Sequence, residues 1–144
     1  RIGKRADLGI FCRSSWEANC LRYFKNLKNW EIEYEPETFT FTQFGVKRGQ
    51  LSYTPDFRIK DPFNGDPFWV EVKGWVATKD ATKLRRWKKH YPEEFATLRA
   101  IVGSRKAKSF TFFKDVLGLP EDRILIYSEL AREYKNCNLL NWEI

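Results

Sequence analysis

Two short segments carry acidic and basic side chains at a spacing that suits metal-assisted hydrolysis. They are YTPDF at residues 53–57 and WVEVKG at residues 69–74. In an extended strand, successive side chains point to opposite faces of the sheet. Glu71 and Lys73 are therefore expected to project from one face, while the valines at 70 and 72 project from the other face into the core. The pattern predicts an acid and a base that point the same way.

The segment around Asp56 is expected to lie beside the segment around Glu71. Pro55 sets its own φ and disfavours a helical conformation at Thr54, so this run is predicted to be extended. Residues 61–67, DPFNGDP, are rich in turn-forming types and would join the two segments as neighbouring strands. Because opposed side chains in paired strands lie about 5 Å apart, Asp56 and Glu71 are predicted to be close together.

Two adjacent carboxylates repel one another unless a cation separates them. Mg²⁺ suits this position, because it prefers hard oxygen ligands and keeps several waters. Asp56 and Glu71 are the predicted metal ligands, and Lys73 would orient or help to deprotonate an attacking water and stabilise charge developing on a phosphate. The alternative for Glu71 and Lys73 is an ordinary exposed ion pair, worth under about 1 kcal/mol.

An N-terminal helix is expected to bring a third acidic residue to this site. Ser14-Ser15 supplies good N-cap residues, and apolar residues recur over 16–27 at three- and four-residue spacings, which predicts an amphipathic helix ending near Asn29. Glu17 lies in its first turn, a position that the helix dipole already favours for a negative charge. If the helix packs beside the sheet, Glu17 completes the metal site directly or supports its ligands.

The remaining sequence alternates predicted strands and helices. Residues 1–13 begin with a basic run without periodicity and are predicted to form a flexible arm. Strands are expected at 32–35, 39–42, 51–59, 68–73, 98–102 and 124–127, and helices at 79–91, 104–117 and 128–134. This order predicts a single domain over 1–144, of α/β class, in which helices flank a central mixed β-sheet.

The helix predicted over 79–91 is strongly basic. Its basic residues are Lys79, Lys83, Arg85, Arg86, Lys88 and Lys89, and Asp80 is the only acidic residue among them. A solvated helix face is the default explanation for such a pattern. Because the segment directly follows the predicted site, contact with nucleic-acid phosphates is the favoured interpretation. A second basic cluster consists of Arg105, Lys106 and Lys108.

Two further side chains near the predicted site have open interpretations. Trp75 could stack on a nucleobase or pack in the core, and the sequence favours neither. His90 is the only histidine, so a histidine-based metal centre has a single candidate. We expect His90 at the surface or beside a phosphate and not as a catalytic base.

Composition indicates a polyanionic partner. The 144 residues contain 26 basic and 19 acidic side chains, a net charge of +7, and the excess lies before residue 115. The three cysteines form no C-x-x-C pair, which argues against a disulfide framework or a zinc knuckle and indicates a reducing cytosol. No apolar run is long enough to cross a membrane, and no nucleotide-binding glycine motif occurs, so neither a membrane nor a nucleotide cofactor is expected.

The residues taken together resemble the PD-(D/E)xK nuclease superfamily. The resemblance covers most of the chain: a helix with Glu17, a meander, Pro55-Asp56, Glu71-Val72-Lys73 and then a lysine-rich helix. The sequence is similar to that of the junction-resolving endonucleases of phages. Transposon-end nucleases and some homing nucleases share the same structural core. The resemblance implies a restriction-endonuclease-like core, Glu17, Asp56 and Glu71 as metal ligands or their supports, Lys73 as the catalytic lysine, Mg²⁺ with Mn²⁺ as a substitute, and a homodimer.

The expected function is therefore Mg²⁺-dependent hydrolysis of DNA. Structure-selective cutting of branched DNA, such as a Holliday junction, is the first choice within this class. Site-specific cutting or nicking of duplex DNA, of the homing or restriction type, is the second. The alternative from another class is a non-catalytic DNA-binding module on the same fold. The presence of all four catalytic residue types favours the enzyme, because a binding module has no chemical need for Lys73 beside Glu71.

Overall fold

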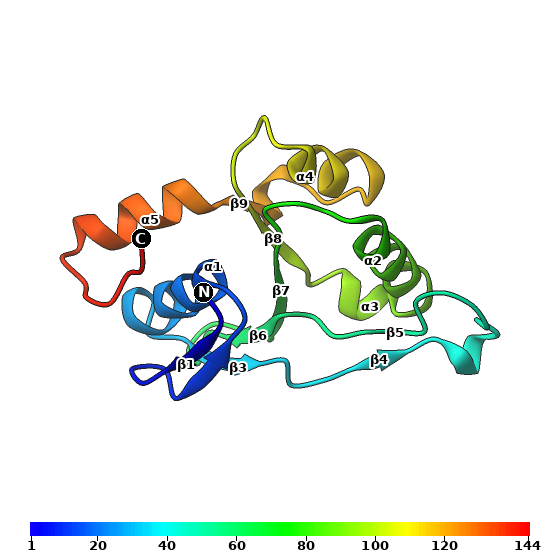
Figure 1. Ribbon diagram of the computed structural model, residues 1–144, viewed down its shortest axis with the longest axis horizontal. Helices are drawn as coiled ribbons and strands as arrows, with labels where there is room; N and C mark the ends of the chain where they lie inside the picture. Colours follow the sequence, from blue (N-terminus) through cyan, green and yellow to red (C-terminus); the bar gives the residue numbers. More distant parts are fainter.

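A five-stranded mixed sheet forms the centre of the computed structural model, which describes residues 1–144 (Figure 1). The strand order is β3-β6-β7-β8-β9. Strands β3, β6 and β7 are antiparallel, whereas β8 and β9 continue the sheet in parallel with β7. The strands are β3 (Glu31–Tyr34), β6 (Phe57–Lys60), β7 (Phe68–Val72), β8 (Arg99–Val102) and β9 (Ile124–Ile126). The predicted mixed sheet flanked by helices is confirmed.

Helices cover both faces of this sheet (Figure 1). One face carries α1 (Ser15–Arg22), its π-helical continuation η1 (Tyr23–Leu27) and α5 (Tyr127–Asn136). The other face carries α2 (Thr78–His90), α3 (Pro92–Phe95), α4 (Lys108–Thr111) and its π-helical continuation η3 (Phe112–Val116). A short 3₁₀ turn, η4 (Glu121–Arg123), precedes β9. None of these helices is both long and apolar enough to cross a lipid bilayer.

The alternation of side chains along β7 divides the buried residues into two cores. Val70 and Val72 point toward α1, where they share one core with Leu21 and Phe24. Trp69 points the other way and packs in a second core with Trp87 of α2. Helix α1 therefore packs against the sheet, as the predicted placement of Glu17 requires.

A separate two-stranded ribbon extends from the sheet beneath α2 (Figure 1). It consists of β4 (Phe39–Thr40) and β5 (Ser52–Tyr53), and a 3₁₀ turn, η2 (Thr42–Phe44), lies in their connection. The strand predicted over 51–59 is thus interrupted between β5 and β6. Pro55 has no N–H to donate to a ladder, and Asp56 lies in a bend directly before β6.

The prediction of a flexible N-terminal arm is wrong. Strands β1 (Gly3–Arg5) and β2 (Ile10–Cys12) pair as an antiparallel hairpin. The side chain of Arg5 is only 2% exposed, and its Nε donates to Glu143 at 2.6 Å. The charge of Arg5, which the local sequence predicts to be solvent-exposed, is therefore neutralised by Glu143, a carboxylate far away in the sequence.

The helix predicted over 104–117 begins later than expected. It starts at Lys108, so Ser109 is buried within the first turn and does not serve as the N-cap. Its second half is π-helical. The other predicted elements exist with shifts at their ends; the final helix, for example, runs from Tyr127 to Asn136 and not over 128–134.

Candidate active site

The register of β6 and β7 places Asp56 beside Glu71. Phe57 pairs with Val70 in this antiparallel ladder, and one further step opposes Asp56 to Glu71. The Asp56 carboxylate accepts a hydrogen bond from the backbone N–H of Val72 at 2.7 Å, while its other oxygen has no hydrogen-bond partner. The predicted proximity of these two carboxylates is therefore present in the structure.

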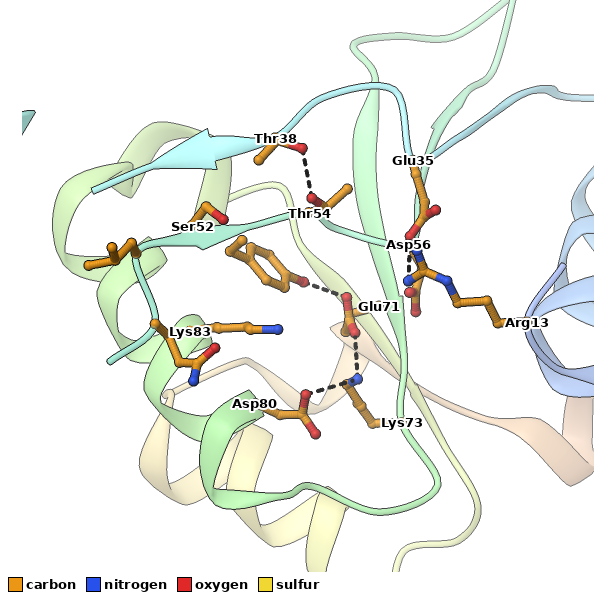
Figure 2. A pocket seen from close by; sticks show the side chains of 13 residues that line it. Arg13, Glu35, Thr38, Ser52, Thr54, Asp56, Glu71, Lys73, Asp80 and Lys83 are labelled. Atoms are coloured by element: carbon orange, nitrogen blue, oxygen red, sulfur yellow. Dashed lines mark hydrogen bonds and ion pairs between the residues drawn. The ribbon is translucent and has the colours of Figure 1, made fainter. Parts of the chain in front are cut away.

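Glu71 and Lys73 point to the same side of β7, as strand alternation predicts (Figure 2). The Glu71 side chain is 2% exposed, and its Oε2 lies 3.2 Å from Lys73 Nζ. Its Oε1 accepts a hydrogen bond from the Tyr53 hydroxyl on the ribbon. The Lys73 ammonium also lies 3.4 Å from Asp80 Oδ1 of α2. The lysine is thus held between two carboxylates that come from different elements.

These side chains line one polar pocket of about 570 Å³ (Figure 2). Its walls come from the β4–β5 ribbon, the adjoining ends of β6 and β7, and the first turns of α2. The lining residues are Arg13, Glu35, Thr38, Gln50, Leu51, Ser52, Tyr53, Thr54, Asp56, Glu71, Lys73, Asp80 and Lys83. Both cationic and anionic side chains are therefore available to a phosphate-bearing ligand in this pocket.

The pocket concentrates negative charge. Burial raises the pKa of Asp56 well above its ordinary value, and the charges of Glu71 and Glu17 raise it further. Burial also raises the pKa of Glu71, although the Lys73 charge opposes this shift. Desolvation would lower the pKa of Lys73, but the neighbouring charges of Glu71 and Asp56 raise it overall. An additional cation near Asp56 and Glu71 would relieve this repulsion.

Glu17 lies behind the pocket and does not line it. Its side chain is buried in the first turn of α1, and it shares hydrogen bonds with Ser14 at 3.1 Å and with the Tyr34 hydroxyl at 3.2 Å. Its charge nevertheless contributes to the raised pKa of Asp56. The structure therefore brings Asp56, Glu71 and Lys73 together and sets Glu17 next to them as a neighbour of Asp56.

The donor set of the pocket fits a magnesium ion. No group of three or more His, Cys, Asp or Glu side chains is arranged as a complete metal cage. Mg²⁺ does not require one, because it is usually held by one or two carboxylates and completes its shell with waters and substrate phosphate oxygens. Asp56 and Glu71 provide two adjacent carboxylates whose mutual repulsion a divalent cation would remove. These two residues are the candidate metal ligands.

Several pocket residues were not predicted as site residues. Asp80 occupies the first turn of α2, where its Oδ2 accepts the backbone N–H of Ala77 at 3.0 Å while its Oδ1 pairs with Lys73. An acidic residue in a first helical turn was the available sequence signal. Arg13 and Glu35 form an ion pair of 2.9 Å at the pocket. Their sequence segments carry no pattern that predicts this contact.

Some of the predicted DNA-binding residues of α2 hold neighbouring loops. Arg86 donates to the backbone carbonyls of Arg48 and Gln50 at 2.8 and 2.6 Å. Lys88 donates to the carbonyl of Leu117 at 2.7 Å. Two of the six basic side chains of α2 therefore have structural roles. Lys83, by contrast, lines the pocket itself.

The other predicted DNA-binding residues differ in their surroundings. Arg105 forms an ion pair with Glu129 at 2.6 Å, and the Arg85 guanidinium lies 5.9 Å from the Phe112 ring. The remaining four are exposed and form no ion pair: Lys79, Lys89, Lys106 and Lys108. These four side chains are free to contact phosphates.

Trp75 is at the surface, so the core alternative for this residue is wrong. Its side chain is 74% exposed. The Trp16 ring packs against the neighbouring Gly74, 3.5 Å from where a Cβ on that glycine would stand. His90 stacks on Phe44 with ring centroids 4.6 Å apart and is partly exposed, in agreement with the expected surface position.

Comparison of the sequence with models of known protein families and with curated proteins found no match.

Proposed function

We propose that this protein is a Mg²⁺-dependent endonuclease that hydrolyses DNA phosphodiester bonds. The observation that carries the proposal is the pairing of β6 with β7, which opposes Asp56 to Glu71 and directs Lys73 into the same polar pocket. Two carboxylates and a lysine brought together where two neighbouring strands adjoin suit hydrolysis of a phosphate ester assisted by a hard divalent cation.

The order of the elements supports a restriction-endonuclease-like core. Helix α1 is followed by the antiparallel strands β3, β6 and β7, then by α2 and the parallel strand β8. This order agrees with the resemblance to the PD-(D/E)xK nucleases. Asp56 directly precedes β6, Glu71 lies on β7, and Lys73 directly follows β7.

The side chains have distinct roles in the proposed reaction. Asp56 and Glu71 would hold Mg²⁺, or Mn²⁺ in its place. Bound there, the ion would make a water a better nucleophile and offset charge on the phosphate. The Lys73 ammonium, held by Glu71 and Asp80, donates hydrogen bonds toward the attacking water and the phosphate oxygens.

Two further residues, Tyr53 and Glu17, act on the proposed metal ligands without binding the metal themselves. The Tyr53 hydroxyl donates to Glu71 and keeps one of its oxygens in a fixed direction. Glu17 adds negative charge next to Asp56 and so strengthens the attraction of this corner for a cation. Both are positioning residues in the proposal.

The basic surface supports DNA as the substrate. The net charge is +7, Lys83 lines the pocket, and Lys79 and Lys89 of the same helix are exposed. Contacts of this kind follow the phosphate backbone and the shape of the nucleic acid and carry little base information. Structure-selective cutting of branched DNA is therefore the proposed specificity, and a homodimer with two centres would cut both strands.

The experiment that tests this function is cleavage of a labelled four-way junction beside a linear duplex with the same arms, in Mg²⁺, with Asp56→Ala as control. Symmetric cuts confined to the junction, absent in the variant, are expected. Cutting of the duplex as fast as the junction, or only at particular sites of the duplex, would support the proposed metal-dependent hydrolysis. It would identify duplex DNA and not branched DNA as the substrate. Tight binding without cutting would contradict the proposal and indicate a non-catalytic DNA-binding module.

A further inference from the structure

Trp75 is an exposed aromatic side chain next to the candidate active site. It follows Lys73 by two residues, and 74% of its surface is accessible. It lines a second hollow of about 350 Å³, which is distinct from the active-site pocket. Other residues around this hollow include Val76, Ala81, Arg85, Lys108 and Phe112. The second hollow combines an apolar floor with two cationic side chains.

The two hollows lie on different faces of the first turns of α2. Asp80 and Lys83 face the active-site pocket, whereas Ala81 and Arg85 face the second hollow. Two residues of chain span at most about 7 Å, so Trp75 is attached within that distance of Lys73. A nucleic-acid strand in a duplex rises about 3.4 Å per nucleotide. The backbone attachment points of Trp75 and Lys73 are therefore separated by no more than about two nucleotides along a strand.

The chemistry of the second hollow favours a nucleotide as its occupant. No acidic side chain lines it, and Lys108 is exposed and unpaired. The Arg85 guanidinium lies over the Phe112 ring, 5.9 Å from the ring centroid. A nucleobase offers a flat apolar face to an aromatic ring, and its flanking phosphates offer negative charge to Arg85 and Lys108. A paired base has both faces covered by its neighbours, so the fitting ligand is an unpaired base.

We propose that Trp75 stacks on an unpaired base of the substrate strand close to the cleaved bond, with Arg85 and Lys108 on the adjacent phosphates. The inference rests on the proposed function, because it takes DNA as the substrate. It supplies a means of selecting distorted or branched DNA without a helix that reads base edges. Trp75 is then a specificity-determining residue for DNA in which bases are unstacked.

The experiment measures binding by fluorescence anisotropy in EDTA, so that the DNA stays intact. Three labelled DNAs are compared: a duplex with a bulge of three unpaired nucleotides, the same bulge with abasic sugars, and the uninterrupted duplex. Trp75→Ala is expected to weaken binding of the first DNA by roughly 5- to 100-fold. Binding of the other two should be unchanged. Trp75→Phe should restore most of the loss, and Phe63→Ala, at a 91% exposed aromatic residue, should have no effect.

Equal losses on all three DNAs, or no loss on the bulged DNA, would overturn the stacking site. Parallel assays of wild-type cleavage in Mg²⁺ separate this result from failure of the proposed function. Selective loss of binding in Trp75→Ala without cleavage by the wild type would support the stacking site and contradict the nuclease. Cleavage by the wild type with unchanged binding by Trp75→Ala would overturn the stacking site alone. Failure of the wild type both to bind any of the three DNAs and to cleave in Mg²⁺ would overturn both.

Discussion

Lys73 is the one basic residue of the active-site pocket that pairs with two carboxylates. Its side chain is 23% exposed and lies within 3.4 Å of both Glu71 and Asp80. Its backbone N–H donates to Ile101 at 2.9 Å and so extends the pairing of β7 with β8. The lysine is thus fixed from its backbone to its ammonium group. Such a residue suits chemistry at one phosphate better than loose contact with many phosphates.

Replacing Lys73 with alanine should therefore separate cutting from binding. We expect cleavage of a four-way junction to fall by at least about 100-fold, because a fixed donor to the reacting phosphate is lost. Binding of the same junction should remain near that of the wild type, since we propose that the exposed lysines supply most phosphate contacts. Single-turnover cleavage and anisotropy measure the two quantities. A loss of binding as large as the loss of cutting would contradict this division of roles.

The central residues of the site were predictable because strand alternation acts locally. Alternation places Glu71 and Lys73 on one face, and the turn at 61–67 brings Asp56 opposite Glu71. The contacts that hold these groups were not predictable. Tyr53 reaches Glu71 from a separate ribbon, and Asp80 reaches Lys73 from a helix. Such contacts depend on how elements pack, which short sequence patterns do not encode.

At the scale of elements, α2 combines structural and exposed basic side chains. Arg86 and Lys88 donate to backbone carbonyls of neighbouring segments, so their loss would disturb those segments. Lys79 and Lys89 are exposed and make no such bond. Substitution of these two lysines therefore tests whether this helix contacts DNA phosphates.

Replacing Lys79 and Lys89 together with glutamine should weaken DNA binding and reduce its dependence on salt. Each lost phosphate contact lowers the slope of log affinity against log salt concentration by about 1, so a reduction of about 2 is expected. Anisotropy titrations at several salt concentrations measure the slope. The matched control replaces Lys4 and Lys60, two exposed lysines outside α2. An unchanged slope in the α2 variant would identify these lysines as an ordinary solvated face.

The sequence predicted most elements but not the N-terminal hairpin or the start of α4. Periodicity over ten or more residues identifies α1 and α2, because one side of each helix packs in the core. The hairpin over residues 3–12 has no such periodicity, and its Arg5 is stabilised by a carboxylate at residue 143. Tertiary contacts of this kind override local charge, which is why the arm was wrongly predicted to be flexible.

At the scale of the whole molecule, Glu143 joins the two ends of the chain to α1. It accepts from Arg5 at 2.6 Å and from Arg22 at 2.8 Å, and its backbone N–H donates to Asn19. Both ends of the chain consequently lie near α1 (Figure 1). Desolvation would raise the pKa of Glu143, but the bonds from Arg5 and Arg22 lower it to about 2.

Replacing Glu143 with glutamine should destabilise the fold in a pH-dependent way. A lowered pKa means that the ionised carboxylate stabilises the folded state fully above its ordinary pKa of 4.5 and that this contribution is lost as pH falls toward 2. We expect the free energy of unfolding at pH 7 to fall by roughly 3 kcal/mol. The difference from the wild type should narrow between pH 4.5 and about pH 2.

Urea unfolding at pH 7 and at pH 3 measures this difference. The control is Glu121→Gln, which removes an exposed ion pair with Lys114 and should change stability little. A difference for Glu143→Gln that stays constant across this pH range would show that its charge does not hold the ends of the chain.

The proposed metal-dependent cleavage is tested most directly by the single-turnover rate of four-way junction cleavage as a function of Mg²⁺ concentration, for the wild type and for Asp56→Asn. The substitution keeps an oxygen that can accept from Val72 and removes one negative charge from the pocket. Asp66→Asn, the same change in the exposed turn, is the matched control. We predict Mg²⁺-dependent cutting by the wild type and the control, and a loss of at least about 100-fold in Asp56→Asn with unchanged junction binding. Equal rates for all three proteins, or cutting that needs no divalent metal, would contradict the proposal.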